Sequence, residues 1–338
     1  MKSEKVNWLI AKYDREESLH LKQSTFTERK IFRPVTHLAV NDPVQISSSG
    51  EIPYFADTMH DGLFSYIVEQ QMNGFTESEK KELEFILKNI WKFTSEMGRG
   101  VLPTGALARA FYHARLIEKT LPNSGCFLEV GPGSGYLTLL LALRGKHVIC
   151  TDVTKSLYIY QEVLFNHFGV VDDDEDEEPF NRRTSIKIAS PFNSAIGRVT
   201  HIPWWVFKNF DETINGEELS VEAVICNHAI CEMHPLSLRH LCYISNKLKI
   251  PKIFAEGLGC PHQGEITAIN DTLSDFGFKL TPILEQTRNV RWVGSGVFIW
   301  EGEGLPETSS KKESSRGGGG EKEAARTGFE DSLDSCSG

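Results

Sequence analysis

Short apolar runs of strand length alternate with segments of helical periodicity through the second half of the chain. The expected strands in this region are 126–130, 147–151, 223–226 and 253–255, and the expected helices are 136–143, 156–168 and 236–248. A strict alternation of strand and helix is typical of βαβ units. The pattern therefore predicts an α/β fold with a sheet whose central strands run parallel.

Three further strands are expected within and after this pattern. Of two candidates for the third strand, 199–202 is preferred over 185–189. A helix at 266–276 precedes two apolar runs, 278–280 and 297–300, which we expect to form an antiparallel pair. The complete expectation is a seven-stranded mixed sheet with an antiparallel last strand.

The residues before this pattern form two segments of different character. Residues 1–55 mix polar residues with prolines and end near a serine-rich cluster at 47–50, so an irregular N-terminal arm is expected. Residues 56–122 show helical periodicity, and Thr76 and Glu79 have the spacing of a capping box at a helix start. These helices form an extension that either caps a ligand pocket or covers the edge of the sheet.

The composition agrees with one large domain, except at the C-terminal end, where it predicts disorder. The chain has 338 residues, of which 40% are hydrophobic and 24% charged, and this allows a full core over 123–304. Residues 305–338 lack the apolar surface that offsets ordering entropy, so a disordered tail is expected. The acidic run at 172–178 is interpreted as a solvated loop rather than a metal site.

Charge and cysteine usage narrow the partners and the compartment. A formal net charge of -10 repels phosphate backbones, and we find no basic patch that offsets it, so no nucleic-acid partner is expected. The seven cysteines have no zinc-type spacing, which favours reduced thiols. No apolar run has the length of a membrane span or a signal peptide, so we expect a cytoplasmic protein without a membrane partner.

A glycine-rich loop follows the first strand of the α/β pattern. The sequence Phe-Leu-Glu-Val-Gly-Pro-Gly-Ser-Gly-Tyr contains Glu129 and then Gly131, Gly133 and Gly135 at alternate positions before a helix. Glycines allow turns where side chains do not fit, and the helix start directs its amide groups at the loop. The next strand ends in Asp152, where a doubly wound fold binds ribose hydroxyls. Together these residues predict a ligand that contains a nucleoside.

The spacing of the glycines identifies the class of ligand. A dinucleotide fingerprint places its third glycine one position later, where this chain has Tyr136. A bulky side chain at that position argues against NAD. The carboxylate of Glu129 suits a ligand with a cationic amino-acid end better than a pyrophosphate, and we therefore infer S-adenosylmethionine.

Over residues 126–301 the chain resembles the class I S-adenosylmethionine-dependent methyltransferases. The resemblance implies a Rossmann-like fold, a cradle for the methionine part of the cofactor and an acidic residue for its ribose. The cradle residues are Glu129, Gly131, Gly133 and Gly135, and the ribose residue is Asp152. The loop, followed by Asn-His-Ala-Ile-Cys-Glu-Met-His at 227–234, is also similar to a branch of sugar O-methyltransferases.

The candidates for chemistry follow the fourth and fifth strands, because ligands bind at the carboxyl ends of the strands in an open α/β sheet. These residues are Asn227, His228 and Glu256. An alcohol acceptor needs a base to take its proton, and His228 is the first candidate; the alternative is a histidine that caps a helix or bonds a carbonyl. Asn227 would hold the acceptor or the cofactor carboxylate, unless it only forms a turn. Glu256 is the second catalytic candidate.

A divalent metal at this end of the sheet stays open as an alternative that is not favoured. His228, Glu232 and His234 are spaced to share a helical face, with Glu256 as a substitute ligand. A turn at 233–235 would scatter these groups. The sequence therefore leaves the metal unassigned.

The predicted function is transfer of a methyl group from S-adenosylmethionine to a hydroxyl of a small polar acceptor such as a sugar. No Asn-Pro-Pro-Tyr or Asp-Pro-Pro-Tyr follows the fourth strand, which disfavours amino methylation of adenine or glutamine. Trp204 and Trp205 either offer a flat surface to adenine or a sugar ring, or pack in the core. Three alternatives stay open: a protein or RNA methyltransferase, a non-catalytic subunit that binds S-adenosylmethionine, and an oxidoreductase with an atypical dinucleotide loop.

Overall fold

The structure is a computed structural model of the chain. It describes residues 2–32, 45–58, 64–170, 184–192, 194–210, 220–230, 232–256, 263–281 and 297–302. The chain divides into two units, Met1–Glu303 and Gly304–Gly338, and all described residues belong to the first unit. The expected tail at 305–338 and the acidic run at 172–178 lie outside the described residues.

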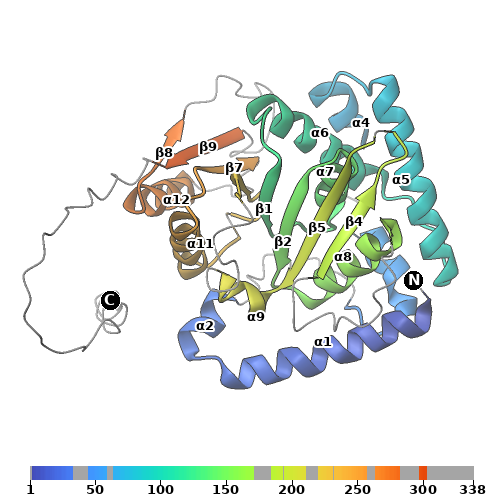
Figure 1. Cartoon of the computed structure of the whole chain (residues 1–338), viewed down its shortest axis with the longest axis horizontal. Helices are drawn as coiled ribbons and strands as arrows, with labels where there is room; N and C mark the ends of the chain where they lie inside the picture. Colours follow the sequence, from blue (N-terminus) through green and yellow to red (C-terminus); the bar gives the residue numbers. More distant parts are fainter. Residues whose placement is uncertain are drawn as a thin grey trace, which may run out of the picture. The chain divides into compact units, whose positions relative to one another are not determined.

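A mixed sheet forms the centre of the first unit (Figure 1). Its strands are β1 (Cys126–Val130), β2 (His147–Asp152), β3 (Gly169–Val170), β4 (Thr184–Ala189), β5 (Ile196–Pro203), β6 (Ala223–Ile225), β7 (Lys252–Glu256), β8 (Phe278–Thr281) and β9 (Val297–Gly302). The order across the sheet is β3-β4-β5-β2-β1-β6-β7-β9-β8. The strands β5, β2, β1, β6 and β7 are parallel, whereas β9 is antiparallel to both β7 and β8. This is a Rossmann-like arrangement, with the expected antiparallel last strand.

The expected count of seven strands is wrong, because the described residues form nine. Both candidates for the third strand are strands: β5 contains 199–202 and β4 contains 185–189. β5 is the parallel neighbour of β2, as the preference for 199–202 predicts. β4 lies six residues before β5, a connection that allows only antiparallel pairing, and β3 pairs with its outer edge. The sheet is therefore extended by two strands beyond the predicted edge.

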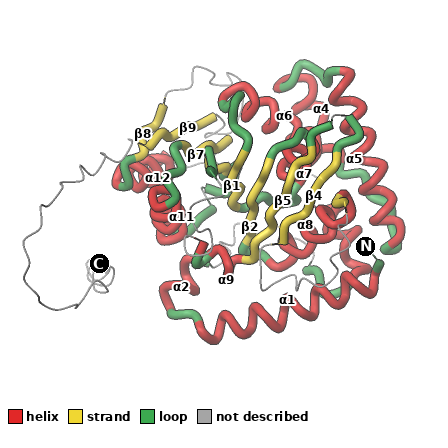
Figure 2. The backbone as a smooth tube through the Cα atoms, viewed as in Figure 1, coloured by secondary structure: helices red, strands yellow, loops and turns green. Residues whose placement is uncertain are grey.

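Helices surround the sheet (Figure 2). Before the first strand they are α1 (Ser3–Gln23), α2 (Phe26–Ile31), η2 (Ser49–Glu51), α3 (Ile52–Thr58), α4 (Phe64–Tyr66), η3 (Ile67–Gln71), α5 (Glu77–Glu96) and α6 (Thr104–Thr120). The later ones are α7 (Tyr136–Leu143), α8 (Lys155–Phe168), α9 (Trp204–Phe207), α11 (Pro235–Lys247) and α12 (Gln263–Asp275). α7 packs on β2 and β5, and α8 packs on β2, β4 and β5. Among the described residues, no helix has the length and apolarity needed to cross a bilayer.

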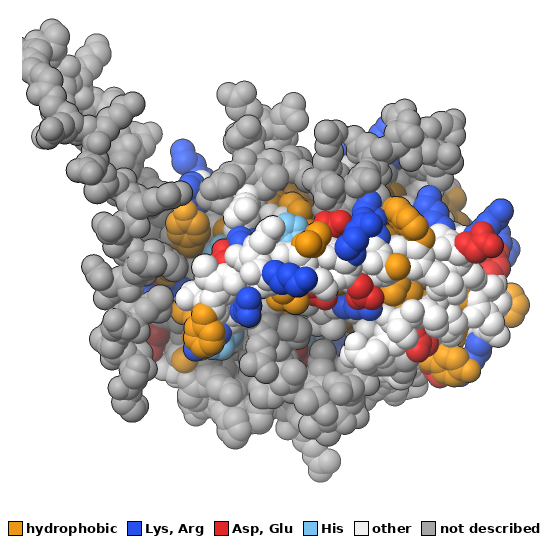
Figure 3. Space-filling view, turned by 90° about the horizontal axis from the view of Figure 1, so that it is seen from below, with side chains coloured by type: hydrophobic (Ala, Val, Ile, Leu, Met, Phe, Trp, Pro, Cys, Tyr) orange, Lys and Arg blue, Asp and Glu red, His pale blue; other side chains and the backbone are white. Residues whose placement is uncertain are grey.

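The prediction of an irregular arm over 1–55 is wrong, because most of its described residues are helical. In α1, Val6, Leu9, Ile10 and Tyr13 recur at helical spacing and are buried. The Tyr13 ring lies 5.2 Å from the ring of Tyr158 on α8. Charged side chains between the apolar positions obscure this stripe in the sequence. In the view from below, α1 faces the reader and its outer side shows basic, acidic and hydrophobic side chains together (Figure 3).

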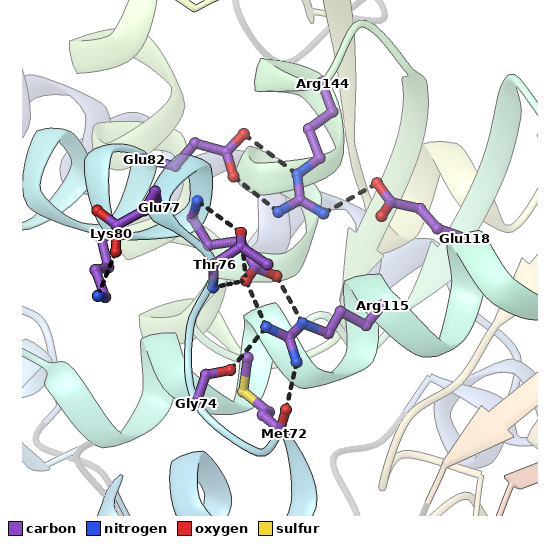
Figure 4. A network of polar contacts seen from close by, with 10 residues as sticks. Met72, Gly74, Thr76, Glu77, Lys80, Glu82, Arg115, Glu118 and Arg144 are labelled. Carbon is purple, nitrogen blue, oxygen red and sulfur yellow. Dashed lines mark hydrogen bonds and ion pairs between the residues drawn. The ribbon is translucent and has the colours of Figure 1, made fainter.

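The helical extension that follows is fastened to the core by ion pairs (Figure 4). α5 begins at the predicted capping box, in which Thr76 N donates to Glu79 Oε2 at 2.8 Å. Arg115 on α6 binds the same carboxylate at 2.5 Å. Arg144, at the end of α7, binds Glu82 on α5 at 2.7 Å and Glu118 on α6 at 2.9 Å. These contacts attach α5 and α6 to the end of α7 that is remote from the glycine loop.

Candidate functional site

The glycine loop between β1 and α7 has a backbone that other residues rarely adopt. Gly131, Gly133 and Gly135 have φ values of 70°, 59° and 76°. A Cβ atom on Gly131 would lie 2.7 Å from the Cβ atom of Ala229, and one on Gly135 would lie 3.0 Å from Gln161. The loop therefore requires glycine both for its conformation and for close approach of neighbouring residues.

Asp152 ends β2 beside this loop and is 5% exposed. Its Oδ1 atom accepts a hydrogen bond from Thr154 N at 2.9 Å, and its Oδ2 atom accepts one from Gln161 Nε2 at 3.3 Å. Burial raises the pKa of Asp152 to about 7, although these hydrogen bonds oppose the shift. The predicted ribose residue is thus a buried carboxyl group held in a fixed orientation.

Glu129 on β1 is also buried, and it accepts a hydrogen bond from the Thr138 hydroxyl. Burial raises its pKa to about 7, and the nearby Asp152 carboxyl adds to the shift. Among the described residues that line the adjacent cavity, neither Glu129 nor Gly135 occurs. Glu129 is therefore buried, bonded to Thr138 and not part of the cavity lining among the described residues.

A cavity of about 260 Å³ lies at the carboxyl ends of β1, β2 and β6. Of the predicted site residues, Gly131, Gly133, Asp152, Asn227 and His228 line it. The pattern of strand ends thus brings together residues that are up to 97 positions apart in the sequence, from 131 to 228. Most of the remaining wall is apolar.

One wall of the cavity comes from the N-terminal segment, which the sequence reasoning missed. Ile31 and Phe32 line the cavity at the end of α2. Ser237 on α11 donates a hydrogen bond to the Ile31 carbonyl at 2.5 Å, and the Phe32 ring stacks on Trp204 at 5.5 Å. A capping box at Thr25 starts α2, and that spacing was the available signal for a helix here.

Two residues that line the cavity each carry a buried polar atom that has no hydrogen-bond partner among the described residues. These atoms are Thr151 Oγ1 and Asn227 Nδ2. Asn227 Oδ1 accepts from Glu256 N at 2.9 Å, and this contact directs the amide nitrogen away from β7. Buried polar groups are normally paired, so these atoms favour a polar ligand in the cavity. The residues present therefore fit a cofactor with both polar and apolar parts.

A cluster of titratable side chains adjoins the cavity at His228. His228 Nε2 lies 3.1 Å from Glu256 Oε2, and His113 Nε2 lies 2.8 Å from the same oxygen. His228 has a left-handed backbone with φ of 54°, and its amide donates to the Glu256 carbonyl at 3.1 Å. The two candidates for chemistry, His228 and Glu256, are therefore direct neighbours at the ends of β6 and β7. His113, from α6, joined them without any signal in the sequence.

The charge of Glu256 is stabilised by its neighbours. Burial alone would raise the pKa of Glu256, but hydrogen bonds from His113 and His228 outweigh burial and hold the pKa well below its usual value. Burial lowers the pKa of His113, so its neutral ring donates Nε2–H to the carboxylate. The cluster therefore contains an ionised carboxylate between two imidazoles.

The metal alternative is supported by distances but opposed by charge. One ligand atom each from His113, His228 and Glu256 lies within 4.8 Å of the other two. However, the Arg109 guanidinium lies 3.1 Å from His228 Nε2, which places a fixed positive charge where an ion would bind. The set suggested by sequence spacing is not formed, because His234 Nδ1 accepts from Leu236 N at 3.2 Å and caps α11.

The two tryptophans expected near the site pack in the core. Trp204 is 2% exposed and donates to Glu17 Oε1 at 3.2 Å. Trp205 is 4% exposed, and its ring stacks on His20 at 5.4 Å. Both contacts involve α1, so these side chains anchor the N-terminal helix and do not line the cavity.

Several solved structures resemble this fold at low sequence identity. Magnesium protoporphyrin IX methyltransferase from Synechocystis PCC 6803 with bound SAM has 13% identity and a TM-score of 0.36, over 75% of this chain and 97% of that chain. A TehB-like SAM-dependent methyltransferase from Corynebacterium glutamicum has 12% identity and a TM-score of 0.35, over 66% and 100%. The methyltransferase domain of the bacterial protein CtHen1 has 9% identity and a TM-score of 0.36, over 57% and 96%.

No family model and no curated protein matches this chain. Similarity to solved structures at such low identity defines neither a substrate nor a mechanism for this protein. The function must therefore be argued from the site.

Proposed function

We propose that this protein is an S-adenosylmethionine-dependent methyltransferase that methylates a hydroxyl group of a small polar molecule, such as a sugar. The observation that carries the proposal is the glycine loop with three positive φ values beside a buried carboxyl group at the end of β2. A cavity adjoins both features, and two of its lining residues each carry a buried polar atom without a partner among the described residues. The combination suits an adenosyl ligand.

The residues that would hold the cofactor follow from their chemistry. The backbone of Gly131 and Gly133 would contact its methionine part, and Asp152 would accept hydrogen bonds from its ribose hydroxyls. Val153 and Leu157 add apolar surface that suits a nucleobase. When bound, S-adenosylmethionine supplies an electrophilic methyl group on a sulfonium sulfur.

His228 is the candidate base for the acceptor hydroxyl. The side chain lines the cavity and is 36% exposed, so an acceptor can reach it. Ionised Glu256 only accepts hydrogen bonds, and Arg109 only donates them, so His228 Nε2 satisfies one of these neighbours at a time. In the tautomer that donates Nε2–H to Glu256, Nδ1 carries the lone pair and takes the proton. The Glu256 carboxylate then stabilises the imidazolium.

Binding and transfer assays test this proposal in two stages. Calorimetry with S-adenosylmethionine, S-adenosylhomocysteine and NADH should show binding of the two adenosyl ligands by wild-type protein and its loss in Asp152→Ala. Binding of NADH alone would support an oxidoreductase instead. A labelled methyl group is then offered with sugars, proteins and RNA; incorporation into a sugar supports the proposal, and incorporation only into protein or RNA contradicts the acceptor.

A non-catalytic subunit is distinguished by the same assays. Such a protein would bind S-adenosylhomocysteine and lose binding in Asp152→Ala, yet transfer no methyl group to any acceptor class. It would also show no acceptor-dependent consumption of S-adenosylmethionine.

A further inference from the structure

A chain of buried polar side chains lies behind the glycine loop. His201 on β5 contacts Glu162 Oε2 through Nδ1 at 2.6 Å and Gln161 Oε1 through Nε2 at 2.9 Å. Gln161 Nε2 in turn donates to the Gly133 carbonyl at 2.6 Å and to Asp152 Oδ2 at 3.3 Å. His201, Gln161 and Glu162 are each no more than 2% exposed.

The orientation of the Gln161 amide follows from its neighbours. A backbone carbonyl can only accept a hydrogen bond, so the group that faces Gly133 must be the amide nitrogen. The amide oxygen therefore faces His201 Nε2, and this ring nitrogen must carry a proton that it donates.

The second ring nitrogen of His201 also faces an acceptor. Glu162 Oε2 lies 2.6 Å from Nδ1, and Glu162 Oε1 accepts a second hydrogen bond from Asn166 Nδ2 at 2.9 Å. Both carboxylate oxygens of Glu162 are therefore engaged, and this side chain holds the His201 ring at Nδ1.

The His201 ring is also fixed by ring contacts. The Tyr158 ring on α8 stacks on the imidazole at a centroid distance of 3.9 Å. The Phe165 ring on the same helix packs edge-on against it at 5.4 Å. The imidazole is therefore held by its two ring neighbours as well as by its two nitrogens.

We propose that His201 is a positioning residue of the cofactor site: its imidazole, held by Glu162 at Nδ1, donates Nε2–H to Gln161 and so orients the amide that joins Gly133 to Asp152. With the amide oxygen bonded to His201, the amide nitrogen faces Gly133 and Asp152. Gln161 donates to Asp152 and so favours the ionised carboxylate that accepts from ribose hydroxyls. The nature of the ligand rests on the proposed function above.

The hydrogen bond from His201 to Gln161 is measured first, on wild-type protein without ligand. Nitrogen-15 NMR of histidine-labelled protein at neutral pH should show the His201 ring with a protonated Nε2, and His201→Gln should remove its signals. If this variant does not fold, the ring is assigned by nuclear Overhauser contacts to Tyr158. A His201 ring with an unprotonated Nε2 overturns the proposal, whether or not the protein binds an adenosyl ligand.

The positioning role is measured by calorimetry with S-adenosylhomocysteine. His201→Phe retains a stacked ring but removes the hydrogen bond to Gln161, so it should weaken binding about tenfold or more, as should Glu162→Ala, which leaves Nδ1 without its partner. His147→Gln is the matched control, since His147 bonds Thr200 at the other end of the same strand pair and should leave affinity within about twofold. Unchanged affinity in a folded His201→Phe protein overturns the role. Failure of wild-type protein to bind overturns the proposed function, while the NMR result still decides the hydrogen bond to Gln161.

Discussion

Three carboxyl groups near the candidate site are equally buried yet differ in charge preference. Glu129, Asp152 and Glu256 are 3%, 5% and 6% exposed. Burial raises the pKa of Glu129 and Asp152 to about 7, whereas the pKa of Glu256 lies well below its usual range. Glu129 and Asp152 accept hydrogen bonds from hydroxyl, amide and backbone donors, and these do not outweigh the rise in pKa that burial causes. Glu256 accepts from two imidazoles, which do outweigh it and lower the pKa. The partner of a buried carboxyl group, rather than its depth, decides its charge.

The two regions also differ in how the chain assembles them. The cofactor side comes from one continuous βαβ segment that includes the glycine loop and Asp152. The acid–base cluster combines His113 from α6 with His228 and Glu256 from the ends of β6 and β7. We therefore expect substitutions in the first region to affect cofactor binding and those in the second to affect turnover.

The largest expected effect separates turnover from binding at the cluster. His228→Gln should lower methyl transfer by about 10³-fold, because a base contributes on the order of 10²–10⁴ to rate. The dissociation constant for S-adenosylhomocysteine should change by less than about threefold, since His228 takes part in no predicted ribose or methionine contact. His234→Asn, which retains the helix cap on α11, is the control. An equal loss of affinity and turnover in His228→Gln would contradict the division into two regions.

The next effect is confined to the cofactor side. Gly131→Ala should weaken S-adenosylhomocysteine binding by about 100-fold and destabilise the protein by about 2–3 kcal/mol, because its Cβ atom would meet Ala229 at 2.7 Å in a left-handed backbone. Calorimetry and urea unfolding measure both quantities. Gly277→Ala is matched in φ at 81° but has no atom within 4 Å, so it should cost only about 1 kcal/mol and leave binding unchanged. Equal behaviour of the two variants would show that the loop makes no close approach.

A third experiment uses the charge of Glu256. Glu256→Gln should reduce the free energy of unfolding by about 2 kcal/mol at pH 7, because the ionised carboxylate accepts from two imidazoles in the folded state. The pKa of Glu256 is lower in the folded than in the unfolded protein, so its ionised carboxylate stabilises the fold at any pH above the unfolded pKa. This stabilisation is lost as the pH falls toward the folded pKa. The difference in the free energy of unfolding between wild type and Glu256→Gln should therefore narrow below about pH 4 in urea unfolding. A gap independent of pH would assign the loss to packing.

The smallest expected effect is a gain in stability, in contrast to the losses above. Glu129→Gln should raise the free energy of unfolding at pH 8 by about 1 kcal/mol, because the ionised form of a group with a raised folded pKa is disfavoured in the folded protein. The Thr138 hydroxyl can still donate to the new amide oxygen. Wild type should lose stability relative to the variant as pH rises from about 4.5 to about 7, and the two should coincide near pH 4 in thermal unfolding. Destabilisation at pH 8 would mean that Glu129 is held ionised.

Much of the cofactor side could be predicted because its signals are local. The bounds of β1 and α7 match the predicted 126–130 and 136–143, and the three alternate glycines form the predicted turn, each with a positive φ. A strand shows its period within a few residues, and a positive φ selects glycine at the position itself. The sequence missed α1 because a stripe of four buried residues carries little weight among many charges.

The α/β alternation, the glycine loop and the place of Asp152 at the end of its strand could all be read from the sequence. The folded chain adds that Phe32 lines the cavity, that His113 and Arg109 reach the His228 and Glu256 cluster, and that His201 joins Gln161. The first set depends on local periodicity and on the position of residues at strand ends. The second set depends on the packing of segments at least 40 residues apart, which leaves no pattern in the local sequence.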